Sequence, residues 1–272
     1  MHQTLGDYIR QRRLLMAATE LRTTQRPIFD IAMDYGYVSQ QTFSRVFRRV
    51  GVKKLSFAIL AIGFASMAAQ AATVYTEFPD NVNPKQKYVF YTHGKVLEGN
   101  TDRPSNPNKP QWGVYDFPAV KEKLSDDGYN LIAYHRAKDT QPDQYADKLK
   151  HDVNTLIAKG VPAKNITLVG FSRGGEITIL AASKLQNKAL NVAILAGCTH
   201  SIQDDAHNRL YGNVLSIYEA SDEVGSCQTI VNHSPGIAHF KEIKISTGQQ
   251  HGAFFRPNPE WVVPLKQWIA SN

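Results

Sequence analysis

The pentapeptide Gly170-Phe171-Ser172-Arg173-Gly174 is the part of this chain whose residue types and spacing most clearly suggest chemistry. It follows the apolar run 165–169, which predicts a buried strand, and it opens a helical pattern that continues to Leu185. A serine on a sharp turn between strand and helix exposes its Oγ, and flanking glycines remove side chains that would clash there. The helix N-terminus also favours developing negative charge. We therefore expect Ser172 to act as a nucleophile.

An acid and a histidine follow Ser172 in the order that a catalytic triad on this kind of turn requires. The run 213–220 predicts a strand that ends just before Asp222, and the run 242–246 predicts a strand that is followed by His251. Both side chains then lie at the carboxyl ends of strands, where α/β sheets bind ligands. We expect His251 to take the serine proton and Asp222 to orient the imidazole. The alternatives are Asp204, Asp205 and Glu223 for the acid, and His200, His207, His233 and His239 for the base.

With a strand expected at Tyr88–Thr92 and the turn His93-Gly94-Lys95 after it, these motifs resemble the α/β-hydrolase family over about residues 73–272. The resemblance implies an oxyanion hole made by the backbone N–H of Arg173 and by that of Gly94 or Lys95. It also implies an enzyme that hydrolyses small carboxylic esters through an acyl-enzyme, without a cofactor. Amides, peptides and thioesters remain alternative substrates, because a fold does not determine a substrate.

The intervening segments alternate between strand and helix patterns. Strands are expected at 129–134 and 191–196, and helices at 145–159 and 261–270. Such alternation predicts an α/β fold with a mostly parallel sheet and helices on both faces. No group of His and Cys has the spacing of metal ligands, so no metal site is expected.

Two loops and two cysteines bear on the surroundings of the site. The stretch 198–213 is short where a lid is often inserted, so an open pocket is expected, with the Pro/Asn-rich loop 99–111 as one wall. Cys198 and Cys227 each follow an expected strand, near the rim of the site. In an oxidising compartment they would form a disulfide, and two buried thiols are the alternative.

A secretory signal is expected before the hydrolase-like part. Lys53-Lys54 precedes the apolar run 55–67, and Ala69-Gln70-Ala71 supplies a small-x-small site, with cleavage after Ala71. A periplasmic or secreted product without a stable membrane anchor would follow. The alternatives are a buried core helix and an uncleaved segment in the inner membrane, with the lysines on the cytoplasmic side.

Residues 5–50 resemble the second half of an AraC/XylS-type regulator domain. The run 27–36 has Pro near its first turn and Gly36 at its end, and Ser39 caps a helix over 40–49 that would be the recognition helix. The resemblance implies contacts to base edges and phosphates from Gln40, Gln41, Arg45, Arg48 and Arg49. The family's other helix-turn-helix and its closing Gly-x-x-Pro-x-x-Tyr-Arg stretch are missing, so we do not expect tight specific binding to DNA.

Most of the net positive charge lies in the N-terminal part of the chain. The chain carries a net charge of +7, of which residues 1–54 contribute +6. We therefore expect a helix-turn-helix segment at 1–51 that is a fusion remnant, a signal peptide or membrane segment at 52–71, and a nearly neutral hydrolase domain at 72–272. The alternative function is a membrane-tethered or cytoplasmic transcription regulator that carries a hydrolase-like sensor domain.

Overall fold

The computed structural model describes residues 73–272 and, upstream of them, Ala17, Glu20, Ile31, residues 34–36 and Phe43. The chain divides into two compact units, residues 1–67 and residues 68–272. The predicted boundaries at 51/52 and 71/72 stay predictions. No helix among the described residues is long and apolar enough to cross a membrane.

In the upstream unit, the described residues Ala17, Ile31 and Phe43 lie in helical segments, and their side chains are buried. Gly36 adopts φ 78° in the turn just after Asp34, the last described helical residue there, which agrees with the expected helix end. A left-handed residue suits glycine at that position. The five residues proposed to contact DNA lie outside the described residues.

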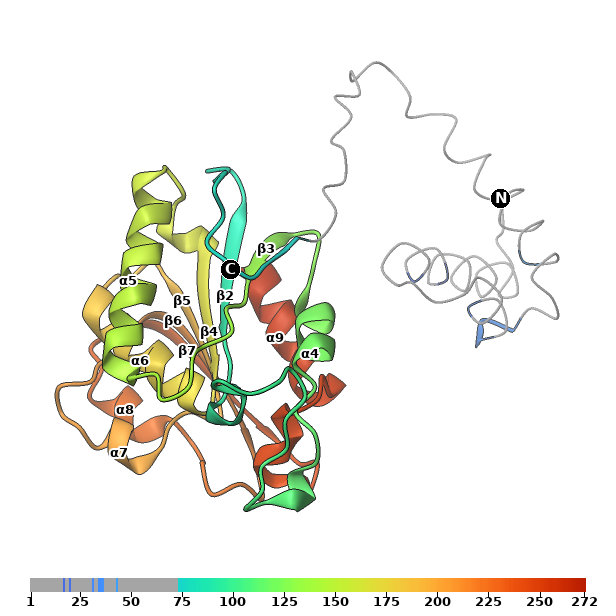
Figure 1. Cartoon of the computed structure of the whole chain (residues 1–272). Coiled ribbons are helices and arrows are strands. Elements are labelled where there is room, and N and C mark those ends of the chain that lie inside the picture. Colours follow the sequence, from blue (N-terminus) through green and yellow to red (C-terminus); the bar gives the residue numbers. More distant parts are fainter. Residues whose placement is uncertain (1–16, 18–19, 21–30, 32–33, 37–42, 44–72) are drawn as a thin grey trace, which may run out of the picture. The chain divides into compact units, whose positions relative to one another are not determined.

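The second unit is built on one parallel sheet (Figure 1). Its order is β1-β3-β2-β4-β5-β6-β7, and every neighbouring pair is parallel. The strands are β1 Val74–Tyr75, β2 Lys87–Thr92, β3 Tyr129–Ile132, β4 Ile166–Phe171, β5 Asn191–Leu195, β6 Tyr211–Glu219 and β7 Gly236–Ile245.

Helices cover both faces of this sheet, as the alternating pattern predicted (Figure 1). Helices α4 (Phe117–Leu124) and α9 (Pro259–Ser271) pack on one face, and α5 (Pro142–Ala158) and α6 (Arg173–Leu185) on the other. The shorter helices are α7 His200–Gln203 and α8 Gln228–Asn232, with 3₁₀ turns η1 Lys95–Leu97, η2 Pro110–Trp112, η3 Ala163–Asn165 and η4 Gln250–Phe254.

The central strands alternate between two cores. In β4, Leu168 packs in the core beneath α5 and α6, while Val169 and Phe171 pack in the core beneath α4 and α9. All six residues of β4 are buried, which is typical of a strand covered on both faces. The end of β4 is therefore held from both sides where Ser172 follows it.

Several element bounds differ from the expectation. Helix α4 was not expected; Asp116 caps it by accepting the Ala119 N–H at 3.1 Å. Helix α5 begins earlier, at Pro142, where a proline fits the first turn. Strand β7 begins at Gly236, whereas the expected start was Glu242. The first part of the strand was missed because β7 lies at the sheet edge, where polar residues interrupt the apolar pattern.

Candidate active site

Ser172 lies between β4 and α6 in a strained turn. Its backbone has φ 54° and ψ −120°, a conformation that L-residues adopt at a cost of about 1–3 kcal/mol. Its N–H donates to the Leu195 carbonyl at 2.9 Å, which fastens the turn to the end of β5. The surrounding sheet thus stabilises a backbone conformation that points a serine out of the strand end.

The glycines of the pentapeptide are required by close backbone contacts. A Cβ on Gly174 would lie 1.9 Å from the Thr92 carbonyl oxygen, and one on Gly170 would lie 2.1 Å from the Gly174 oxygen. No backbone atom can yield by that much without moving β2 or α6. The helix therefore starts so near the sheet that only glycine fits on either side of Ser172.

Asp222 and His251 meet across the loops that follow β6 and β7. The His251 Nδ1 lies 2.6 Å from Asp222 Oδ2, and the two side chains are 10% and 4% exposed. With its Nδ1 proton donated to Asp222, the imidazole presents an unprotonated Nε2 for accepting another proton. Ser172 and His251 line the same cavity.

The alternative acids and bases lie elsewhere. Asp205 pairs with His207 at 2.9 Å, and the Asp204 carboxylate lies 3.7 Å from His200, all with substantially exposed side chains. Glu223 is 87% exposed and pairs with Lys109 at 3.4 Å. None of these side chains lines the cavity that holds Ser172.

The turn after β2 lies next to Ser172. A Cβ placed on Gly94 would be 3.5 Å from the Ser172 Cβ, and Lys95 lines the cavity as the first residue of η1. Burial raises the pKa of Tyr115 to about 12, and hydrogen bonds from the Tyr91 hydroxyl and the Gly94 backbone oppose that rise. Both expected donors, Gly94 and Lys95, lie beside the cavity that holds Ser172.

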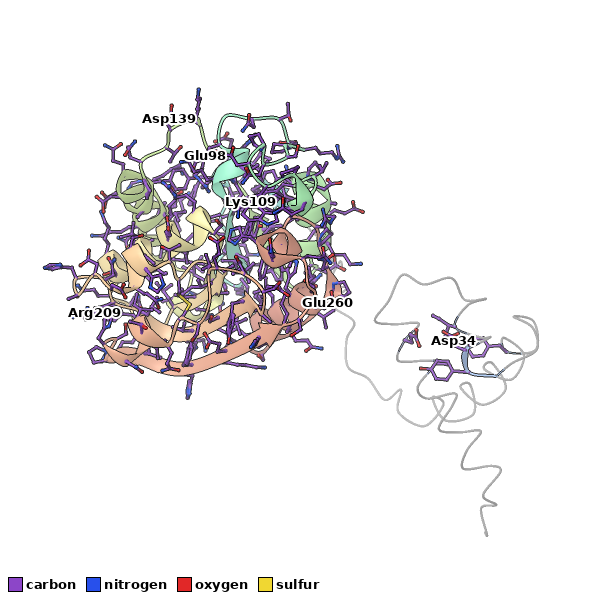
Figure 2. The ribbon with its side chains drawn as sticks, turned by 90° about the horizontal axis from the view of Figure 1, so that it is seen from below. Asp34, Glu98, Lys109, Asp139, Arg209 and Glu260 are labelled. Atoms are coloured by element: carbon purple, nitrogen blue, oxygen red, sulfur yellow. A yellow bond between two sulfur atoms is a disulfide. The ribbon has the colours of Figure 1, made fainter. Side chains whose placement is uncertain are left out.

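A buried ion pair, missed by sequence reasoning, holds this turn from behind. Arg136 Nη2 lies 3.1 Å from Glu98 Oε1 and donates to the His93 carbonyl at 2.6 Å. The Arg136 N–H also donates to His93 Nε2 at 2.9 Å. Burial, followed by the Arg136 charge, lowers the pKa of His93 well below its usual value, so this ring is neutral. Figure 2 labels Glu98, which directly follows η1.

The cavity in front of Ser172 has a volume of about 410 Å³. Aromatic rings form much of its wall, and two asparagines of the loop 99–111 line it as expected. The Trp112 ring of η2 lies 5.2 Å from the His251 ring, and its Nε1 donates to Gln250 at 3.2 Å. The lining residues are Gly94, Lys95, Val96, Asn106, Asn108, Trp112, Tyr115, Phe171, Ser172, His251 and Phe255.

Cys198 and Cys227 form a disulfide in the structure, with their Cα atoms 5.2 Å apart. It joins the loop after β5 to the start of α8. Neither cysteine lines the cavity, and the expected position near the catalytic rim stays a prediction. No group of side chains in the described part of the chain could hold a metal ion.

Two family models match separate parts of the chain. A helix-turn-helix domain model matches residues 1–51, and a phospholipase/carboxylesterase model matches residues 129–246. The first match agrees with the resemblance drawn from residues 5–50. The second covers β3 to just past β7 and includes Ser172 and Asp222, while His251 follows it.

Curated relatives match a short part of this chain. The regulatory protein SoxS of Escherichia coli strain K12 is 92% identical over 48 residues, which are 18% of this chain and 45% of SoxS. The right origin-binding protein of the same strain is 56% identical over 45 residues, 16% of each chain. The chain therefore spans less than half the length of these relatives.

Two solved structures are similar to the second unit. A predicted CIB-like hydrolase from Thermoplasma acidophilum is 15% identical with a TM-score of 0.48, over 71% of this chain and 90% of that one. XC6422 from Xanthomonas campestris, described as an α/β serine hydrolase without a lid, is 14% identical with a TM-score of 0.44, over 71% and 83%.

Proposed function

We propose that this chain, which contains an AraC-type helix-turn-helix segment followed by a hydrolase domain of the α/β-hydrolase fold, is a serine hydrolase for small carboxylic esters. One observation carries the proposal. Ser172 lies on a strained strand-to-helix turn and shares a cavity with His251, whose other ring nitrogen is bound to a buried Asp222. A nucleophile, a base and a group that orients the base are the parts that acyl transfer requires.

The reaction proceeds in two halves. In the first, Ser172 Oγ attacks the ester carbonyl carbon while His251 Nε2 takes its proton, and Asp222 stabilises the imidazolium. The tetrahedral intermediate collapses, the imidazolium gives its proton to the departing alkoxide, and an alcohol and an acyl-serine result. In the second, water gives a proton to His251 and attacks the acyl carbon. The intermediate then collapses, the acid leaves, and the imidazolium returns its proton to Ser172 Oγ.

The oxyanion of each intermediate would be held by two backbone N–H groups. Arg173 is the first residue of α6, where helix N–H groups have no partner within the helix. The second donor would be the N–H of Gly94 or that of Lys95, which lie in the turn after β2 and line the same cavity as Ser172. Removing one such donor typically costs about 10²–10³-fold in kcat.

The cavity favours a small ester. Its volume of about 410 Å³ is near the lower end of the range for ligand sites, about 300–1,000 Å³. Four aromatic rings, those of Trp112, Tyr115, Phe171 and Phe255, line it and offer apolar contacts to a short acyl group or an aryl group. Amides and thioesters remain secondary candidates, because the same machinery cleaves them.

A series of 4-nitrophenyl esters with acyl chains from acetate to decanoate tests this function. We expect kcat/KM to be highest for the short acyl groups and Ser172→Ala to remove turnover by a factor on the order of 10⁶. Gln186→Ala, at the far end of α6, is the matched control with wild-type turnover. Wild-type turnover by Ser172→Ala would reject the nucleophile, and a preference for decanoate would reject the proposed substrate size.

We further propose that the hydrolase domain acts in the periplasm or outside the cell after cleavage behind Ala71. The disulfide between Cys198 and Cys227 supports this location, because disulfides persist in oxidising compartments. Intact mass and N-terminal sequence of the product in fractionated cells test it. A periplasmic or secreted chain that begins at Ala72 is expected; a chain that keeps residues 1–71 in the membrane or cytoplasm would refute export.

A DNA-binding regulator is the second candidate, favoured by the helix-turn-helix model that matches residues 1–51 and by the similarity of 48 residues to the regulatory protein SoxS. In that case Gln40, Gln41 and Arg45 would contact base edges, and Arg48 and Arg49 phosphates. A mobility-shift assay with the full chain, at stated salt, measures this activity. Sequence-specific binding that Arg45→Ala weakens would support it, and equal affinity for all DNA sequences would not.

A further inference from the structure

Glu219 is a buried carboxylate at the last position of β6, and only 1% of the residue is exposed. Its two oxygens bind two different loops. Oε2 accepts from the Ser221 N–H at 2.6 Å and from the Ser221 hydroxyl at 2.5 Å. Oε1 accepts from the N–H groups of Thr247 and Gly248 at 2.9 and 3.0 Å. Glu219 therefore joins the loop after β6 to the loop after β7.

These two loops carry the acid and the base. Asp222 directly follows Ser221, and its N–H donates to the Glu219 carbonyl at 3.1 Å. His251 lies three residues after Gly248. The last bond of the strand ladder here is Ala220 N–H to the Ile245 carbonyl, at 2.8 Å. Beyond it the Glu219 carboxylate accepts hydrogen bonds from the loop after β7, and further along Asp222 meets His251.

We propose that Glu219 is a positioning residue for catalysis, which sets the separation of the two loops so that Asp222 reaches His251. This inference rests on the proposed serine-hydrolase function. The carboxylate does not line the cavity, so it acts through the two loops and not on the substrate. An error of about 1 Å in the placement of a catalytic group can cost on the order of 10²-fold in rate.

The ionised carboxylate suits this task better than an amide. Burial raises the pKa of Glu219, but the hydrogen bonds from Ser221, Gly248 and Thr247 outweigh it, so the pKa is lowered overall. The ionised form is acceptor-only and has two oxygens, one for each loop. In Glu219→Gln one oxygen becomes an NH₂ group, which meets N–H donors and cannot bind them. One of the two loops then loses its anchor.

Glu242 of β7 provides a matched control. Its two oxygens bind the Ser226 hydroxyl at 2.6 Å and the Cys227 N–H at 2.9 Å, so it also anchors a loop through both oxygens. Ser226 and Cys227 lie at the α8 end of the loop that carries Asp222, four and five residues after Asp222. Glu242→Gln therefore removes the same charge and the same kind of anchor at the other end of that loop, away from the bonds to Thr247 and Gly248.

The experiment compares the full-length wild type, Glu219→Gln and Glu242→Gln by two measurements. Steady-state hydrolysis of 4-nitrophenyl butyrate separates kcat from KM, and proton NMR detects the far-downfield signal of the His251 Nδ1–H that Asp222 accepts. For Glu219→Gln we expect kcat to fall 10- to 100-fold with KM within twofold, and the signal to weaken or shift. Glu242→Gln is expected to keep both at wild-type values.

Equal kcat values and equal NMR signals in the two variants would overturn the inference. If the wild type hydrolyses no ester, the proposed function fails, but the NMR comparison still decides whether Glu219 positions the pair. If Glu219→Gln does not fold, Ser221→Ala takes its place, because it removes only the Ser221 hydroxyl and leaves the other donors to the Glu219 carboxylate. It should lower kcat in the same direction by a smaller factor, and an unchanged kcat and signal in that variant would overturn the inference.

Discussion

The buried pair of Arg136 and Glu98 allows a quantitative prediction about stability. The two side chains are 0% and 5% exposed, and they lie 3.1 Å apart behind the turn that follows β2. Among the described residues, Glu98 is the one carboxylate that pairs with the Arg136 guanidinium. The Nη1 atom of the same guanidinium is buried without a hydrogen-bond partner. The change Glu98→Gln keeps the shape and one acceptor oxygen but removes the negative charge.

The expected loss of stability follows from burial. Breaking a buried pair costs about 3–5 kcal/mol, because it leaves an uncompensated charge. The amide oxygen of Gln can still accept a hydrogen bond, so we expect the lower end of this range, about 3 kcal/mol. For a domain of this size that corresponds to a fall in Tm of about 6–12 °C. Asp147→Asn is the control, because its exposed pair with Lys184 should contribute about 1 kcal/mol or less.

Urea unfolding followed by tryptophan fluorescence measures both variants at neutral pH. All three tryptophans, Trp112, Trp261 and Trp268, lie in the hydrolase domain, so the signal reports its unfolding. We predict a clear shift of the urea midpoint for Glu98→Gln, with an unchanged slope. Equal midpoints for Glu98→Gln and Asp147→Asn would refute it, since the burial of the ion pair would then carry no energetic consequence.

Three further predictions concern the glycines, the disulfide and pH. Gly174→Ala should prevent folding of the site, because its Cβ would lie 1.9 Å from a backbone oxygen, whereas Gly225→Ala, with nothing within 4 Å, should leave Tm and turnover unchanged. Reduction of Cys198–Cys227, 29 residues apart, should lower the free energy of unfolding by about 3–4 kcal/mol, measured by urea melts with and without reductant; equal melts would contradict this. Because the pKa of His93 is lowered in the folded state, the unfolded chain binds a proton at higher pH than the folded chain does. The free energy of unfolding should therefore fall as the pH drops below about 6.5. His93→Gln should flatten this dependence between about pH 6.5 and 5.

The sequence predicted the central strands and the positions of Ser172, Asp222 and His251, because these follow from strong local patterns. Buried parallel strands are mostly apolar, as in β4 and β5, and so stand out from their surroundings. A sharp turn that needs glycine on both sides leaves a readable spacing. The edge strand β7 lacked such a signal, because the polar and exposed residues His239, Lys241 and Lys244 interrupt its apolar pattern.

The supporting residues could not be read from the sequence, since each depends on contacts between distant segments. Arg136 and Glu98 are 38 residues apart, and nothing in either neighbourhood marks a buried charge. Glu219 looks like the polar end of a strand until Thr247 and Gly248 are seen to donate to it. Helix α4, in contrast, could have been predicted from the sequence. A capping residue, Asp116, precedes apolar residues at helical spacing, namely Phe117, Val120 and Leu124.

Covalent labelling of Ser172 tests the central claim most directly. The full chain is treated with a fluorophosphonate, which reacts with activated serines, and the modified residue is located by mass spectrometry of its peptides. We predict a single adduct on Ser172 in the wild type, none in Ser172→Ala, and strongly slowed labelling in His251→Asn. Labelling of another serine, or equal rates for the wild type and His251→Asn, would contradict the assignment of Ser172 as a nucleophile activated by His251.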